Sequence, residues 1–123
     1  MRKLILVISL FSMLSLVAKA QARMDFTGVD TSTYRLYEKG EWKELTRVAR
    51  EAYRQGIDYF YLRLRTGIAW YNLGNYMQAE INLEKALELN STDRTAIEYL
   101  YYSYLMQKKG SDALGLLEDV IEL

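Results

Sequence analysis

The sequence predicts an all-α protein whose helices pair into hairpins that stack as a right-handed superhelix. Three observations lead to this fold class. Apolar residues recur at steps of three and four along the chain, which is the spacing of one helix face. Half of the 123 residues are hydrophobic and none is proline, which is untypical of a disordered or low-complexity chain. The third observation is a repeat of fixed length, which also sets the number of hairpins.

The repeat is clearest over Trp70–Asn90. This stretch combines the end of one helix, a Gly-Asn corner and a second amphipathic helix. Three copies fit the chain, at 26–59, 60–93 and 94–123. We call the shift from one copy to the next, from position 26 to position 60 and from 60 to 94, the repeat period. The positions that match at this period are Gly40 with Gly74, Trp42 with Tyr76, Ala52 with Ala86, Leu83 with Leu117, and Ala86 with Val120.

Residues 1–20 have the three parts of a secretory signal peptide. Met1–Lys3 supplies a positive end, Leu4–Val17 is an apolar run, and Ala18–Ala20 fits the small-residue pattern that signal peptidase cleaves. The apolar run is shorter than the roughly 20 residues that a spanning helix needs, so we expect cleavage rather than anchoring. We therefore expect an exported chain that begins at Gln21 and lies in a bacterial periplasm or cell envelope, without membrane insertion.

The first hairpin is expected to follow a flexible lead-in over 21–30. Thr31–Thr33 carry hydroxyls that can cap a helix start, so the domain is expected over 31–123, with a first helix closed by Gly40. The partner helix has a clear apolar stripe and ends at Gly56. The stripe consists of Trp42, Leu45, Val48, Ala49 and Ala52.

The second hairpin begins with a helix that Asp58 is expected to cap and that runs to Leu73. Gly67 lies in the middle of this helix and costs about 1 kcal/mol relative to alanine. A glycine at this place therefore needs a reason in the packing of the helix.

The third hairpin follows the turn and cap cluster Asn90–Asp93. Its corner, Lys108–Gly110, lies two residues later than the corners at Gly40 and Gly74, so a shifted turn is expected. The sequence ends within an apolar stripe, so the last helix is expected to leave a stacking face open. The apolar residues are Ile97, Leu100, Tyr101 and Tyr104 on one helix and Ala113, Leu116, Leu117, Val120 and Ile121 on the other.

The repeat period, the corner Asn72–Tyr76 and the ending Lys85–Asn90 make the chain from residue 26 onward resemble the tetratricopeptide repeat (TPR) family. The resemblance implies an α-α superhelix of three helix-turn-helix repeats. It places Gly67 at a small position where the two helices of a repeat cross closely. Arg63 and Thr66 depart from the family pattern, which prefers a bulky aromatic residue and a leucine there.

In TPR proteins the first helix of each repeat lines an inner, concave surface on which partners bind. The resemblance therefore implies a groove for a protein or peptide segment, and tyrosine suits such a groove because it offers a large ring and a hydroxyl. Packing between repeats is the alternative role for these side chains. The candidates are Tyr34 and Tyr37, then Tyr61, Leu64, Ile68, Tyr71 and Asn72, then Glu98, Tyr102, Leu105 and Met106.

One known TPR device, a basic clamp for a terminal carboxylate, is not expected. Of the matching positions only Arg65 is basic, and the others are Asp30, Tyr34, Thr95 and Tyr99.

We expect a non-enzymatic interaction module with no catalytic residue, cofactor or metal site. The chain has no histidine and no cysteine, so the usual general base and thiol chemistry are missing. Glu80, Glu84 and Glu88 are expected to form a solvated outer face. After residue 20 there are 13 basic and 16 acidic residues, which disfavours nucleic acid or an anionic membrane as the partner.

Two alternative functions stay open at this point. The chain could be the N-terminal docking or assembly domain of a larger protein of the cell envelope, associated with the outer membrane. It could instead be a structural module that associates with itself through its C-terminal helix.

Overall fold

The computed structural model of the chain describes residues 23–122, and this range folds into helices without a strand. The all-α fold class is therefore confirmed. The predicted signal peptide, residues 21 and 22, and Leu123 lie outside the described residues. The helices are α2 (Phe26–Glu38), α3 (Trp42–Arg54), α4 (Phe60–Asn72), α5 (Tyr76–Leu89), α6 (Arg94–Met106) and α7 (Gly110–Glu122).

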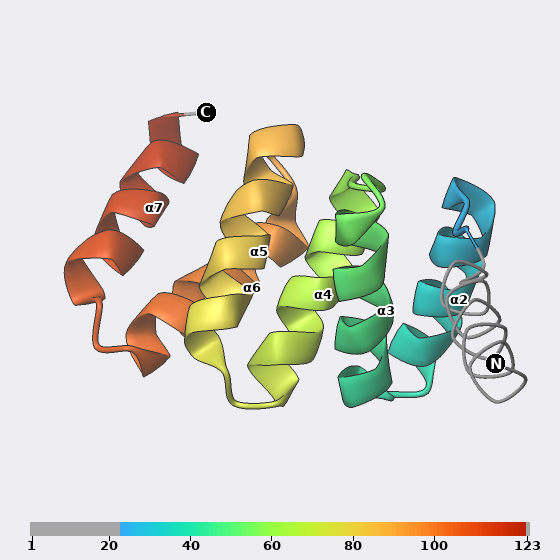
Figure 1. The fold of residues 1–123 in the computed structure, drawn as a ribbon. Helices are drawn as coiled ribbons and strands as arrows, with labels where there is room; N and C mark the ends of the chain where they lie inside the picture. The colour runs from blue at the N-terminus through green and yellow to red at the C-terminus, as the bar shows by residue number, and fades with distance from the viewer. Residues whose placement is uncertain (1–22, 123) are drawn as a thin grey trace, which may run out of the picture.

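The helices stand in a row in chain order and form two layers (Figure 1). Each helix packs against the next one, and α4 also packs against both α2 and α6. Over residues 23–122 the backbones of α3 and α5, and those of α5 and α7, do not approach each other in this way. We therefore call α2, α4 and α6 the inner layer, which is closely packed, and α3, α5 and α7 the outer layer. This arrangement is consistent with an α-helical solenoid.

The helix starts follow one spacing through the whole row. The inner helices begin at positions 26, 60 and 94, and the outer helices begin at positions 42, 76 and 110, so both sets advance by the repeat period. The expected shift of the third corner is wrong. Lys108 has φ 59°, in the place where Gly40 has 66° and Gly74 has 76°. The third corner therefore lies at the same place in the repeat as the first two, but a lysine and not a glycine takes the left-handed conformation there. Gly110, which suggested the shift, is the first residue of α7.

The first helix begins earlier than expected, so the flexible lead-in over 21–30 is wrong for its last five residues. Asp25 is the N-cap of α2, and its Oδ1 accepts a hydrogen bond from the Gly28 amide at 2.6 Å. Thr31–Thr33 consequently lie inside the helix. There the Thr33 hydroxyl is buried and donates to the Val29 carbonyl at 2.8 Å.

The expected cap at Asp58 is also wrong, because this carboxylate has another partner. Tyr59 is the N-cap of α4, with no side-chain hydrogen bond to the helix. Asp58 instead accepts two hydrogen bonds from Arg63, from Nε at 2.8 Å and from Nη2 at 2.7 Å. The cap expected from Asn90–Asp93 is confirmed, since Asp93 accepts from the Ala96 amide at 2.8 Å.

The crossing of α4 and α5 explains the glycine in the middle of α4. A Cβ added to Gly67 would lie 2.6 Å from Cγ and 2.8 Å from Cδ2 of Leu83, which is fully buried. The expected packing reason for Gly67 is thus confirmed. Two core clusters run along the row: Val29, Ala49, Ala52 and Leu62 join α2, α3 and α4, and Ala79, Leu83, Ala86, Ala96 and Leu100 join α5 to α6.

Candidate protein-interaction surface

Tyr71 of α4 and Tyr99 of α6 lie in contact, and Tyr37 of α2 is near enough to Tyr99 to affect its pKa; we call these three residues the tyrosine cluster. The Tyr71 and Tyr99 rings meet edge to face with centroids 5.2 Å apart. Partial burial, then the nearby hydroxyls of Tyr37 and Tyr71, raise the pKa of Tyr99. The cluster therefore gathers side chains from α2, α4 and α6 on one face.

The three rings of the tyrosine cluster pack against other aromatic rings and against the core. Tyr37 lies edge to face against Trp42 at the start of α3, with ring centroids 5.8 Å apart. Tyr71 packs in the same way on Tyr76, at 5.3 Å, and both Tyr71 and Tyr99 rest on the core cluster of α5 and α6. The rings are thus part of the inter-helix packing. Their hydroxyls make no hydrogen bond within residues 23–122.

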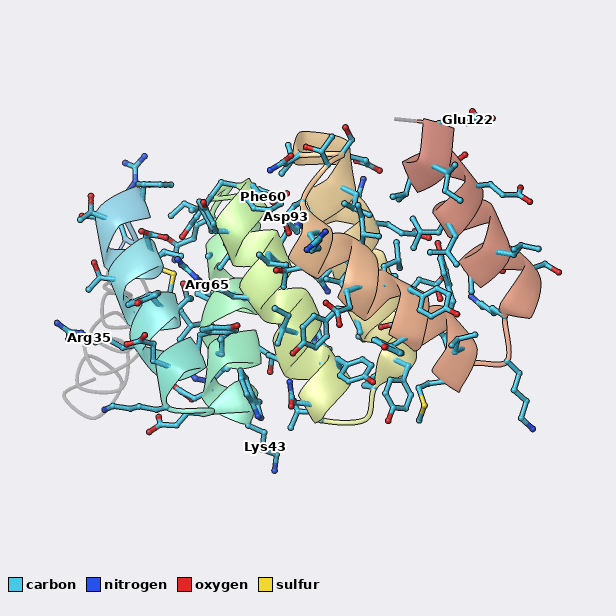
Figure 2. All side chains as sticks on the ribbon, turned by 180° about the vertical axis from the view of Figure 1, so that it is seen from behind. Arg35, Lys43, Phe60, Arg65, Asp93 and Glu122 are labelled. Carbon is cyan, nitrogen blue, oxygen red and sulfur yellow. The ribbon has the colours of Figure 1, made fainter. Side chains whose placement is uncertain are left out.

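A second group of residues surrounds Arg65, which lies between α2 and α4 in Figure 2. The Arg65 side chain is 12% exposed and donates to Asp30 Oδ1 at 2.7 Å and to Thr33 Oγ1 at 3.2 Å. Its guanidinium carbon is 5.4 Å from the ring centroid of Tyr34 and 5.6 Å from that of Tyr61. Both tyrosines are exposed.

The hydrogen bond from Arg65 holds the pKa of Asp30 below its usual range. The carboxylate is therefore charged at neutral pH and offsets the guanidinium charge. Because Arg65 is committed to Asp30 and Thr33, the surface beside it is aromatic rather than basic.

The structure brings only some of the predicted site residues together. Tyr37 and Tyr71 belong to the tyrosine cluster, and Tyr34 and Tyr61 flank Arg65. Ile68 was predicted at the surface, and this is wrong, because its side chain is 2% exposed and lies in the interior.

The remaining candidates lie elsewhere. Leu64 is half-buried against the core, and the Asn72 amide donates to the Ile68 carbonyl at 2.8 Å near the end of α4. Glu98, Tyr102, Leu105 and Met106 are exposed on α6.

Two residues of this surface were missed as binding candidates, Tyr99 and Arg65. The TPR resemblance points to both residues only as positions of a carboxylate clamp. Tyr99 follows Arg65 by one repeat period, so the same inner-layer position carries both side chains. This periodicity could have identified Tyr99 as an inward-facing residue.

Of the three glutamates expected on a solvated outer face, Glu84 and Glu88 are exposed, whereas Glu80 is not. Glu80 is 15% exposed, and its carboxylate accepts from Lys109 Nζ at 2.8 Å and from Gln107 Nε2 at 2.6 Å. Glu84 accepts from the Tyr104 hydroxyl at 2.7 Å. Both carboxylates therefore tie α5 to α6 and to the turn before α7. Over residues 23–122 no group of three acidic side chains is placed to hold a metal ion.

None of the helices between residues 23 and 122 combines the length and the apolar character needed to cross a membrane. Comparison of the chain with protein-family models, with curated proteins and with solved structures gives no match in any of the three. The candidate surface is therefore judged on its own chemistry.

Proposed function

We propose that this chain is an exported TPR protein of three repeats whose inner layer binds a segment of a partner protein, without catalysis. The observation that carries the proposal is the tyrosine cluster, in which side chains from three successive inner helices gather on one face. The common spacing of all the described helix starts supports the repeat assignment. The sequence of residues 1–20 supports export.

The chemistry of the surface favours a polypeptide partner. A tyrosine hydroxyl both donates and accepts a hydrogen bond, so it can pair with either group of a peptide backbone. The rings are already held by Trp42, Tyr76 and the core, so little side-chain entropy is lost when a partner binds. Because Asp30 offsets the charge of Arg65, burial of this surface does not leave an isolated cation.

Affinity capture from the cell envelope of the source organism tests the binding face. One bait is the chain itself, and a second carries Tyr37→Phe, Tyr71→Phe and Tyr99→Phe, which keeps the rings and removes the hydroxyls. A third, matched bait carries Met77→Ala and Ile81→Ala, which alter exposed apolar residues of α5 in the outer layer. Circular dichroism confirms that all three baits are equally helical.

We expect a protein recovered by the first and third baits and lost or strongly reduced with the second. Each hydroxyl that pairs in the complex contributes about 1 kcal/mol, so loss of three lowers the affinity by more than tenfold. Equal recovery with all baits, or loss with the third alone, contradicts binding at the inner layer. Export is tested separately: expression of the full chain in a bacterial host should yield a mature N-terminus at Gln21.

A further inference from the structure

The side of the α6–α7 pair that faces away from α5 is an apolar face whose counterpart in the preceding pair is covered. In α5 the fully buried Leu83 packs in one core cluster with Ala96 and Leu100 of α6, and Ile68 of α4 is 2% exposed. The residues one repeat period later are Tyr102, 45% exposed, and Leu117, 37% exposed. Ile121 beside them is 83% exposed. We call these three residues, with Leu105, the open edge.

The open edge is hollowed and acidic. A groove of about 350 Å³ lies between α6 and α7, and its lining includes Tyr102 and Leu117 together with Arg94 and Glu98. Helix α7 carries four acidic residues and no basic one. The exposed Glu118 lies one repeat period after Glu84, whose carboxylate accepts the Tyr104 hydroxyl of the covering helix at 2.7 Å. A donor on a covering element would meet Glu118 in the same way.

We propose that the open edge binds one amphipathic helix of a partner protein, with an apolar stripe and basic residues beside it. Helix α6 shows the shape that such a groove accepts. It packs Ala96, Leu100 and Ser103 against the preceding pair, and all three are buried there. A partner helix with the same order of small and large side chains fits the open edge, and its lysine or arginine residues face Glu98 and Glu118.

A second copy of this chain is a poorer occupant. In a head-to-tail stack α2 would take the place that α6 has in the row. It offers Ser32 where α6 has Leu100, and Arg35 where α6 has the fully buried Ser103. A guanidinium at such a position is costly because it is buried without a carboxylate. In a two-fold pair the Glu118 side chains of both copies would approach each other, and like charges repel.

Fluorescence anisotropy with labelled peptides tests the proposal on the full chain. The basic probe copies residues 93–109 with Glu98→Lys, so that it carries the stripe of α6 and an added positive charge. A matched acidic probe copies the same residues with Arg94→Glu, Lys108→Glu and Lys109→Glu. We expect saturable micromolar binding of the basic probe and binding at least about tenfold weaker for the acidic one.

Variants of the chain locate the site. Ile121→Asp should weaken the basic probe by about tenfold or more, and Ile121 is so exposed that folding is unaffected. Glu118→Lys should weaken binding of the basic probe and strengthen binding of the acidic probe. Tyr37→Phe combined with Tyr71→Phe, on the tyrosine cluster, should leave the affinity for both probes unchanged. This test is therefore independent of the function proposed above.

Three results would overturn the proposal: no saturable binding of the basic probe, binding that is insensitive to Ile121→Asp, or equal binding of both probes. Sedimentation of the chain alone supplies a fourth check. A dimer that Ile121→Asp dissociates shows that a second copy, and not a partner helix, covers the open edge.

Discussion

At the scale of single residues, Gly67 and Leu83 determine how closely α4 and α5 approach. Helix propensity alone favours Gly67→Ala by about 1 kcal/mol. The added Cβ would lie 2.6 Å from Leu83 Cγ, inside van der Waals contact, so the buried Leu83 side chain or one of the helices must shift. We expect a net loss of about 1–3 kcal/mol in the free energy of unfolding, measured by urea denaturation.

The control for this prediction is a double-mutant cycle with Leu83→Ala, which alone should cost about 2–5 kcal/mol. Because the cavity left at position 83 accommodates the methyl group at position 67, the two losses should not add. Additive losses would show that Gly67 matters for a reason other than contact with Leu83.

Lys108 stores conformational free energy at the third corner. Its φ of 59° lies in the left-handed region, which costs a residue with a Cβ roughly 1 kcal/mol, whereas Gly74 takes φ 76° without strain. Lys108→Gly should therefore stabilise the chain by about 0.5–1 kcal/mol, and Gly74→Ala should destabilise it by a similar amount. Thermal unfolding resolves this, since about 1 kcal/mol moves Tm by several degrees in a domain of this size. A lower Tm for Lys108→Gly would contradict the assignment of strain.

The helix caps are a feature that the local sequence does not determine. Asp25, Thr31 and Asp58 can each cap a helix by their chemistry, and the local sequence does not rank them. Asp25 caps α2, whereas Asp58 pairs with Arg63. The choice depends on tertiary neighbours, so the cap chemistry of Thr31–Thr33 and Asp58 did not predict the residue that caps α2 or α4.

At the scale of helices, Arg63 and Thr66, which differ from the TPR pattern, belong to a polar network. The Tyr53 hydroxyl of α3 donates to Thr66 Oγ1 at 3.1 Å, with Asn82 Oδ1 of α5 at 3.3 Å. Arg63 lies 3.8 Å above the Tyr53 ring and donates to Asn82 Oδ1 at 3.1 Å. These hydrogen bonds join three helices, at the positions where the TPR pattern has a bulky aromatic residue and a leucine.

The network predicts a loss of stability at alkaline pH. Burial raises the pKa of Tyr53 to about 12, against about 10 in an unfolded chain. The folded state therefore favours the neutral phenol, so its contribution is complete below about pH 10 and is lost as the pH rises towards 12. We expect Tyr53→Phe to flatten the decline of the unfolding free energy over this range, measured by urea titrations at stepped pH. At pH 7 the variant should lose about 0.5–1.5 kcal/mol, because the hydrogen bond to Thr66 is gone. An unchanged alkaline slope would exclude Tyr53 as its source.

For the whole molecule, the sequence predicted the repeating helices and corners but not the side-chain pairs that join different helices. Apolar spacing within each helix and the repeat period between hairpins predicted the order of helices and corners, although not the start of α2. The resemblance to TPR proteins identified Tyr37 and Tyr71 of the candidate surface. The pairing of Arg65 with Asp30 joins two different helices and leaves no periodic signal, so the charge balance of the surface required the structure.

The row of helices also predicts how stability is distributed along the chain. Within residues 23–122, α4 packs against α2, α3, α5 and α6, whereas α7 packs against α6 alone. In such a one-dimensional arrangement stability is a sum of unit and neighbour terms, so the end with one neighbour opens first. Native-state hydrogen exchange should therefore show the highest protection in α4 and α5 and the lowest in α7.

Two variants test this distribution. Ala113→Gly, at a buried position of α7, should lower protection in α7 and leave protection in α4 nearly unchanged. Leu83→Ala should lower protection in every helix that exchanges by global unfolding. Uniform protection along the row, or equal effects of both variants, would mean that the helices unfold as a single cooperative unit.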